Sequence, residues 1–285
     1  MKNIPNRFSR NIGILSSEEQ SKLFSSNVAV VGLGCTGCMI VEFLARAGVG
    51  GFVLIDGDRF DETNINRQLY AKSSTVGQYK VEAAKKAIQE INPSASIAAH
   101  PVFLESEENH QFLQTSDLIV NGVDDPFSMV IIHRIAKALS KPSVFLLSGV
   151  IPFQGACCVI PVDSAVDYET LMGLPTANQP LDRPLEIKRD LFEKITKARL
   201  SSALRRGVIP GPWVENRLNG GHVPSFGITS NITSLIAANE AIKVLINRPN
   251  LRPVYAPDLI YFDGAACNLT VWRAKPGKFW FQGDF

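Results

Sequence analysis

The chain has 285 residues, of which 45% are hydrophobic and 20% are charged, and its formal net charge at pH 7 is +2. This length suits one large α/β domain with a substantial core and is short for two independent domains. The near-neutral charge excludes a global attraction to nucleic acid or to an anionic membrane as the main basis of binding.

The sequence contains no apolar stretch long enough for a membrane helix, so we expect no membrane partner. The segment from Met1 to Gly13 lacks the apolar core of a secretory signal. The five cysteines form no regular framework, which is typical of reduced thiols. We therefore expect a cytoplasmic protein.

The first part of the chain alternates strands with helices. Ser16 to Glu19 has capping-box spacing and predicts a short helix towards Phe24. Apolar runs predict strands at 27–31, 52–55, 96–102, 117–120, 143–147 and 156–160. Helices are expected at 36–47, at 76–91 and from Asp124 to Leu139. This alternation predicts a doubly wound, Rossmann-like, mostly parallel sheet.

The pattern changes after Pro161. Residues 162–222 contain scattered Pro and Gly residues, and we interpret them as a long crossover segment with one basic helical stretch at 185–206. The default interpretation of that basic stretch is a solvated face, and the alternative is a surface that guides an acidic partner.

Regular structure is expected again in residues 223–285. This part is predicted to hold a helix at 225–246 and a C-terminal antiparallel strand pair at 259–263 and 269–272. We therefore expect a single domain, 1–285, built from parts 1–161, 162–222 and 223–285.

A glycine-rich turn follows the first predicted strand. Gly32, Gly34 and Gly37 form G-x-G-x-x-G at the start of a helix. Missing Cβ atoms permit a tight turn and let phosphate oxygens approach the backbone, while the helix N-terminus offers free N–H groups. Asp56 ends the next strand, at the spacing expected of a carboxylate that binds ribose hydroxyls. The pattern predicts a nucleotide site and leaves NAD and ATP open.

The loop after Asp56 favours ATP. It supplies polar and cationic side chains close to the glycine turn, namely Asp58, Asn64, Arg67, Gln68 and Lys80. A triphosphate attacked at its α-phosphorus needs such groups, whereas a dehydrogenase needs an open nicotinamide pocket there. Asp58 and Asp125 are equally consistent with capping the turns in which they lie.

Several ordered motifs give the chain a specific resemblance. They are R-F-S-R, V-G-L-G-C-T-G, L-I-D-G-D, T-N-I-N-R-Q, V-G-Q-Y-K-V-E-A-A, I-N-P, N-G-V-D-D, N-E-A-I-K-V-L and I-Y-F-D-G. From Arg7 to about Trp272 the chain resembles the superfamily of ThiF, MoeB and the ubiquitin-activating enzymes. The resemblance implies ATP-dependent adenylation of a carboxylate, with release of pyrophosphate.

The same resemblance implies roles for individual residues. Asp56 would hold the ribose, and Asp124 would bind Mg²⁺ that bridges the phosphates. Arg10 would act as an arginine finger on the nucleotide of the partner subunit in a homodimer. The side chains that would surround the triphosphate are Asn64, Arg67, Gln68 and Lys80.

The cysteines depart from the family pattern. Many members bind zinc through two C-x-x-C pairs, but here only Cys35 and Cys38 have that spacing, inside the glycine turn, so we expect no zinc site. Residues 162–222 contain no cysteine. Cys157, Cys158 and Cys267 are expected to be packed in the core. We therefore expect adenylation without a stable enzyme thioester.

The acceptor remains open at this point. The resemblance allows the C-terminus of a small ubiquitin-like protein or a carboxyl of a ribosomal precursor peptide. A tRNA-modifying dehydratase of the same superfamily is a less favoured alternative. An NAD(P)-dependent Rossmann oxidoreductase and a non-catalytic scaffold are rivals from other classes.

Overall fold

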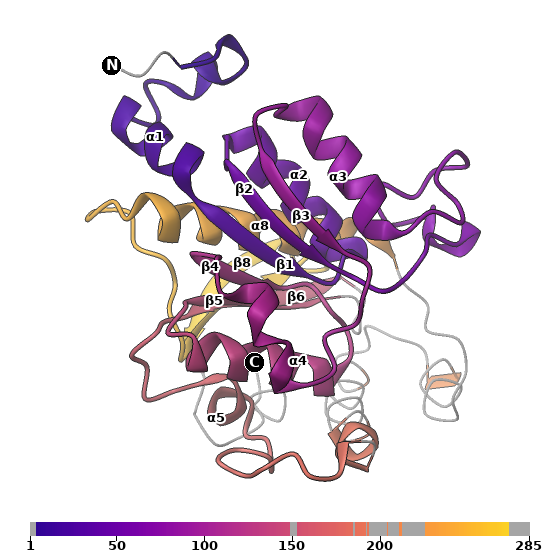
Figure 1. Cartoon of the computed structure of the whole chain (residues 1–285). Coiled ribbons are helices and arrows are strands. Elements are labelled where there is room, and N and C mark those ends of the chain that lie inside the picture. The colour runs from indigo at the N-terminus through magenta and orange to yellow at the C-terminus, as the bar shows by residue number, and fades with distance from the viewer. Residues whose placement is uncertain are drawn as a thin grey trace.

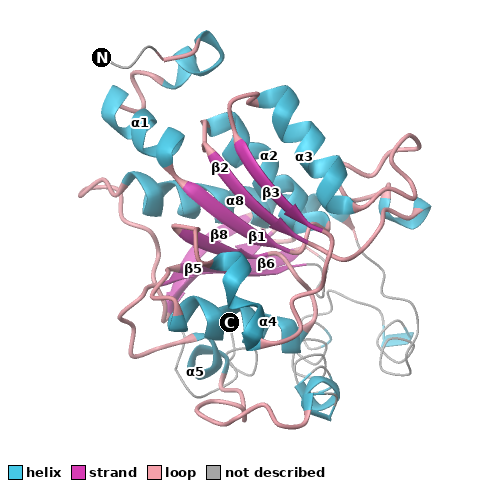
Figure 2. Cartoon of the chain, viewed as in Figure 1, coloured by secondary structure: helices cyan, strands magenta, loops and turns pink. Residues whose placement is uncertain are grey.

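The structure is a computed structural model, and it describes residues 4–148, 153–184, 186–191, 193, 204, 211, 212 and 226–273. Its centre is an eight-stranded sheet with the order β3-β2-β1-β4-β5-β6-β7-β8 (Figures 1 and 2). The strands are β1 Asn27–Val31, β2 Gly51–Ile55, β3 Ser96–His100, β4 Leu118–Asn121, β5 Ser143–Ser148, β6 Gln154–Ile160, β7 Asp258–Asp263 and β8 Asn268–Arg273. Neighbours from β3 to β5 are parallel, and those from β5 to β8 are antiparallel.

Helices cover both faces of the sheet (Figure 1). The α-helices are α1 Ser17–Ser25, α2 Cys35–Ala47, α3 Lys80–Ile91, α4 Pro126–Ala138, α5 Tyr168–Met172 and α8 Gly227–Ile246. The 3-10 helices are η1 Asn6–Asn11, η2 Glu62–Asn64 and η3 Glu107–Leu113. None of the helices in these described ranges is both long and apolar enough to cross a bilayer.

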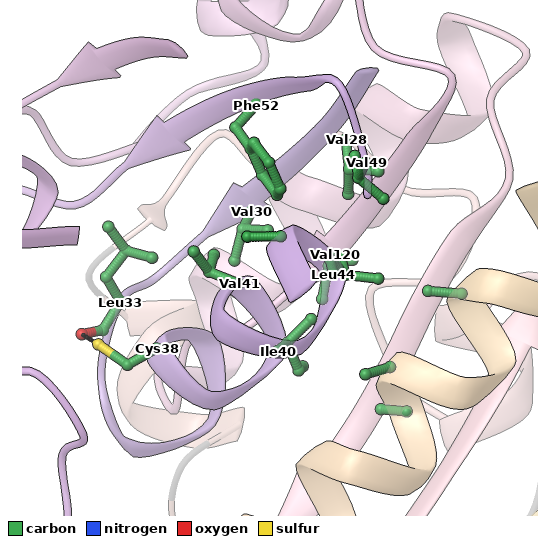
Figure 3. Packing of buried hydrophobic residues seen from close by; sticks show 14 of the residues in the cluster. Val28, Val30, Leu33, Cys38, Ile40, Val41, Leu44, Val49, Phe52 and Val120 are labelled. Atoms are coloured by element: carbon green, nitrogen blue, oxygen red, sulfur yellow. Dashed lines mark hydrogen bonds between the residues drawn. The ribbon is translucent and has the colours of Figure 1, made fainter. Parts of the chain in front are cut away.

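The alternation of side chains along β1 divides the core between the two faces. Val28 and Val30 pack with α2, α3 and α8, whereas Ala29 and Val31 pack with α4 and η3. Figure 3 shows the first of these clusters, in which Val41 and Leu44 of α2 lie over the strands. A parallel strand buried on both faces requires a continuous apolar run, and β1 has one.

The ends of the helices follow the local sequence. Ser16 caps α1 by accepting a hydrogen bond from the Glu19 amide at 3.1 Å, and Glu19 accepts one from the Ser16 amide at 2.8 Å, which confirms the predicted capping box. Asp125 caps α4 and Pro126 occupies its first turn. Gly48, at φ 98°, ends α2 in the left-handed conformation.

The predicted doubly wound sheet and its C-terminal strand pair are confirmed, but several boundaries differ. The helix expected at 76–91 begins at Lys80, because Gly77 has a φ of 84° and the Lys80 amide bonds to the Asp58 carbonyl at 3.0 Å. The strand expected at 96–102 ends at His100. The five-residue helix α5 was not expected from the sequence.

Some expectations fall outside the described residues. These include most of the basic stretch 185–206 and the start of the helix expected at 225–246. Of that helix, the structure describes Gly227–Ile246.

The order of the strands fixes the place of the crevice. After β3 the chain returns to the other side of β1 to form β4, so the connections from β1 and β4 diverge to opposite faces. A doubly wound sheet has its ligand crevice at such a switch point, beyond the carboxyl ends of the strands. The glycine turn follows β1 and the Asp124 loop follows β4, so both lie at this edge.

Candidate active site

The three glycines of the turn have different structural roles. Gly32 has a φ of +88°, and a Cβ there would lie 2.7 Å from the Val123 nitrogen. A Cβ at Gly37 would lie 1.9 Å from the Gly32 carbonyl oxygen. At Gly34 a Cβ would meet only the Gln68 Nε2 atom, at 3.9 Å. Gly32 and Gly37 therefore make the tight turn, and Gly34, the N-cap of α2, leaves open space for a phosphate.

The carboxylate of Asp56 is tied to this turn. Its Oδ2 accepts a hydrogen bond from the Leu33 amide at 2.6 Å, and its Oδ1 accepts one from the Asp58 amide at 2.8 Å. Burial raises the pKa of Asp56, and the nearby Lys80 ammonium opposes that shift. Each oxygen retains a further lone pair, so the carboxylate can also accept from ribose hydroxyls.

Lys80 is a buried cation beside that carboxylate. It is the first residue of α3, and its Nζ lies 2.8 Å from Asp58 Oδ2 and 4.0 Å from Asp56 Oδ2. A buried ammonium needs such counter-charges. The Asp58 side chain is 53% exposed, so a phosphate can compete with it for the ammonium. Asp58 therefore pairs with Lys80, in addition to donating its amide to Asp56.

The loop from η2 to Gln68 carries the other predicted polar residues, and it meets the glycine turn where Cys35 Sγ donates to the Arg67 carbonyl at 3.1 Å. Gln68 is buried and its Oε1 has no hydrogen-bond partner among the described residues. Asn64 accepts from the Asp61 amide at 3.2 Å. Arg67 Nη1 donates to the Thr63 carbonyl at 2.7 Å and to Asn66 Oδ1 at 2.9 Å. Within the described ranges Gln68 Oε1 thus lacks a partner, and the Arg67 guanidinium bonds only to its own loop. We expect a bound nucleotide to change the hydrogen-bond partners of these two groups.

The Asp124 loop lies against the glycine turn. The Gly122 amide donates to the Val31 carbonyl at 2.7 Å, and Thr36 Oγ1 of α2 donates to the Gly122 carbonyl at 3.1 Å. Asp124 is exposed and has no hydrogen bond or ion pair within the described part of the chain.

Asp125, the next residue, caps helix α4. Its Oδ2 accepts from the Ser128 amide at 2.8 Å, and its Oδ1 lies 3.2 Å from Lys188 Nζ. The capping interpretation is therefore confirmed for Asp125.

Arg10 lies away from the glycine turn of its own chain. It is an exposed residue of η1, and the next residue, Asn11, donates to the Ala47 carbonyl at the C-terminal end of α2 at 3.3 Å. The glycine turn is at the other end of this 13-residue helix, about 20 Å away. The glycines, Asp56, Gln68, Lys80 and the Asp124 loop come together at the carboxyl edge of the sheet, whereas Asn64 bonds within its own loop and Arg10 lies elsewhere.

One of the cysteines does not lie where it was predicted. Cys157 and Cys158 are buried, as expected, but Cys267 is exposed in the turn between β7 and β8, where its φ of 52° keeps it outside a strand. The prediction that Cys267 is packed in the core is wrong. Burial raises the pKa of Cys35 to about 11. Within the described ranges no three His, Cys, Asp or Glu residues gather as a metal site.

A buried polar group behind the Asp124 loop was not identified from the sequence. Asn121, His133 and Ser143 are joined by hydrogen bonds between β4, α4 and β5. The sequence offered one signal for this group, which is that Asn121 belongs to the N-G-V-D-D motif. His133 gave none, because it lies on an otherwise apolar helix face.

Curated relatives match parts of longer proteins. Adenylyltransferase and sulfurtransferase uba4 of Emericella nidulans is 37% identical over 249 residues, which cover 86% of this chain and 44% of that protein. The tRNA threonylcarbamoyladenosine dehydratase of Bacillus subtilis is 42% identical over 119 residues, or 41% of this chain and 47% of that protein. The chain thus spans less than half the length of these relatives.

Solved structures share the fold. E. coli MccB with ATP has a TM-score of 0.71 at 17% identity, over 95% of this chain and 72% of that chain. E. coli MccB with MccA-N7isoASN has a TM-score of 0.72 at 17% identity, over 96% of this chain and 73% of that chain. The sequence profile of the ThiF family matches residues 8–277. Because this match spans nearly the whole sequence, the chain belongs to the ThiF family.

Proposed function

We propose that the chain is an ATP-dependent adenylyltransferase that activates a carboxylate and releases pyrophosphate. The observation that carries the proposal is the convergence of the open Gly34 turn, the Asp56 carboxylate and the buried Lys80 ammonium at the switch point of the sheet. Membership of the ThiF family and the likeness to ATP-bound MccB support ATP over a dinucleotide.

Different residues bind the ribose and the phosphates of ATP. Asp56 accepts hydrogen bonds from the ribose, and the free amides at the start of α2 receive phosphate oxygens. Lys80 exchanges its contact with Asp58 for the triphosphate. Arg67, Asn64 and Gln68 complete the contacts with the triphosphate.

The chemistry needs no enzyme nucleophile. A carboxylate oxygen of the acceptor forms a bond to the α-phosphorus, and the bond from that phosphorus to the oxygen bridging the β-phosphate breaks. The electron pair of the broken bond leaves with pyrophosphate, and no proton need be transferred. The rate then depends on alignment and on the charge of Lys80 and Arg67 at the phosphates.

Asp124 suits a role as a Mg²⁺ ligand. Its carboxylate is unpaired among the described residues and its loop packs on the phosphate turn, and Mg²⁺ favours carboxylate and phosphate oxygens. Bound there, Mg²⁺ would offset negative charge on the phosphates. Three protein ligands are not required, because substrate phosphates and waters complete the coordination.

The relatives support two classes of acceptor. We propose the C-terminus of a small ubiquitin-like protein or a carboxyl of a ribosomal precursor peptide, in a cytoplasmic enzyme. The resemblance to the ubiquitin-activating enzymes supports the first class, and the likeness to MccB solved with MccA supports the second. The position of Arg10, far from its own glycine turn, supports a homodimer in which Arg10 serves the partner's nucleotide.

Exchange of labelled pyrophosphate into ATP in the presence of the acceptor tests the proposal. Lys80→Ala should lower the exchange rate by at least about 100-fold, because the variant loses a buried charge beside the triphosphate. Lys86→Ala, on the exposed face of the same helix, is the matched control and should exchange at the wild-type rate. Equal exchange by both variants would remove Lys80 from the mechanism.

A tRNA-modifying dehydratase is the second candidate, favoured by the Bacillus subtilis relative. Here ATP would activate a carboxylated adenosine of tRNA for loss of water. Incubation with ATP and tRNA followed by nucleoside mass spectrometry distinguishes the two candidates. A dehydrated nucleoside with tRNA, and no exchange with protein or peptide acceptors, would establish the dehydratase instead.

A further inference from the structure

A line of hydrogen bonds connects the interior of the sheet with the Asp124 loop. His133 Nδ1 lies 2.9 Å from Ser143 Oγ of β5, and His133 Nε2 lies 3.2 Å from Asn121 Nδ2 of β4. Asn121 Oδ1 in turn accepts from the Val123 amide at 3.2 Å. The three side chains are all buried. The line ends one residue before Asp124.

The contacts assign a direction to each hydrogen bond in this line. Burial lowers the pKa of His133 to about 3, so the ring is neutral at physiological pH. A neutral imidazole has one donor and one acceptor nitrogen. Because the Val123 amide occupies Asn121 Oδ1, the Asn121 Nδ2 group must donate to His133 Nε2. The ring proton is therefore on Nδ1 and is donated to Ser143.

The ring is also fixed in its plane. Tyr168 of α5 stacks on His133, with ring centroids 4.5 Å apart and planes 21° apart, and Phe145 meets it edge-on at 6.1 Å. With the plane of the ring fixed, His133 Nε2 accepts from Asn121 Nδ2. The same orientation of the amide keeps Asn121 Oδ1 facing the Val123 amide.

The Asp124 loop is thus anchored at both ends. On one side Asn121 holds the Val123 amide, and on the other Asp125 caps α4 through the Ser128 amide at 2.8 Å. Asp124 lies between these anchors and is itself unpaired within the described ranges. A free side chain on a backbone fixed from both sides is the arrangement of a preorganised ligand.

We propose that His133 is a positioning residue that, through Asn121 and the Val123 amide, holds the Asp124 carboxylate beside the phosphate turn for Mg²⁺ bound with ATP. This inference rests on the proposed function. It assigns to His133 a role in cation-dependent binding of ATP, with no contact between His133 and the nucleotide.

Calorimetric titration with ATP, once with Mg²⁺ and once with EDTA, tests the inference without measuring activity. His133→Phe keeps an aromatic ring against Tyr168 but cannot accept from Asn121, and Asn121→Ala removes the next link. In the wild type, Mg²⁺ should raise the affinity for ATP by some factor. In both variants that factor should be about tenfold smaller, whereas the affinity for ATP in EDTA should be unchanged. Asp124→Ala should lose the same gain.

Two controls separate positioning from stability. His133→Gln restores an acceptor and should recover most of the Mg²⁺-dependent gain, whereas His110→Phe, at an exposed site in η3, should leave it unchanged. If His133→Phe does not fold, the Mg²⁺-dependent gain in ATP affinity of Asn121→Ala, which retains the His133 ring, tests the inference.

The outcomes that contradict the inference differ from those that contradict the function. A wild-type gain in both His133→Phe and Asn121→Ala overturns the inference alone. A wild-type protein that binds no ATP in either titration refutes the proposed function, and the inference with it.

Discussion

At the scale of single residues, the site combines groups that are already paired with groups that are not. Lys80 is balanced by Asp56 and Asp58, so its charge is tolerated in the absence of ATP. Gln68 Oε1 and the Asp124 carboxylate are unpaired among the described residues. A triphosphate would replace one counter-charge of Lys80, and Mg²⁺ bound with it would satisfy the Asp124 carboxylate, which favours binding at this place.

The buried neutral ring of His133 also predicts how stability varies with pH. The pKa of His133 is about 3 in the folded chain, against an ordinary value of 6.5. The contribution of His133 to the free energy of unfolding is therefore complete above pH 6.5. It is lost as the pH falls towards 3, because only the unfolded chain takes up a proton on this ring in that interval. The expected loss is about 1.4 kcal/mol of unfolding free energy per pH unit.

Urea unfolding of the wild type and of His133→Phe at pH 7, 6, 5 and 4 measures this contribution. The difference between their unfolding free energies should shrink as the pH falls, since the variant lacks the titrating group. A difference that stays constant with pH would show that the ring is not held neutral.

At the scale of elements, the stretch after β6 is fastened to α4 by a buried ion pair. Arg134 Nε and Nη2 donate to the two carboxylate oxygens of Glu169 at 2.8 and 2.9 Å. The same guanidinium donates to the Thr176 and Gln179 carbonyls at 2.8 and 2.6 Å. This clamp fixes α5, and with it the ring of Tyr168 that stacks on His133.

Glu169→Ala should therefore lower the free energy of unfolding by about 3 kcal/mol, because it leaves a mostly buried guanidinium with only the exposed carboxylate of Glu107 as a counter-charge. Glu107→Ala is the matched control. It removes another carboxylate 3.2 Å from Arg134, but that side chain is 52% exposed, so the expected loss is below about 1 kcal/mol. Chemical denaturation of the two variants provides the comparison, and equal losses would contradict the account of the clamp.

Elements with strong local signals were predictable from the sequence. The strand predicted at 27–31 agrees with β1 at both ends, because a buried apolar run stops at glycines. The start of α3 was not predictable, because it depends on Gly77 and on a hydrogen bond from Lys80 to the Asp58 carbonyl far back along the chain. The helix α5 is too short for its periodicity to be recognised.

The sequence could name candidate residues, whose roles stay predictions, but it could not give their arrangement. The motif identified the glycines, but only the packing shows that Gly34 is the open one. The polar line behind Asp124 joins residues on three separate elements, and no spacing in the sequence indicates such contacts. The exposure of Cys267 depends on its turn.

At the scale of the whole molecule, the position of Arg10 predicts shared active sites. Arg10 lies at the far end of α2 from its own glycine turn, so we expect it to act in a second copy of the chain. Arg10→Ala and Lys80→Ala should each be inactive alone in pyrophosphate exchange. After the two variants are mixed and allowed to exchange subunits, activity should return to about a quarter of the wild-type level, as one site in a mixed dimer is intact.

Light scattering gives the mass of the assembly for the same samples. A monomeric wild type with full exchange activity, or an inactive mixture of exchanged dimers, would remove Arg10 from the partner's site.

The central claim is that ATP lies on the glycine turn, and calorimetric titration with ATP and with NAD⁺ tests it most directly. The wild type should bind one ATP per chain and no NAD⁺. Gly34→Val should fold, since a Cβ there meets only Gln68 Nε2 at 3.9 Å, but its side chain should fill the phosphate space and abolish binding. Binding of NAD⁺ in place of ATP, or undiminished ATP binding by a folded Gly34→Val, would contradict the claim.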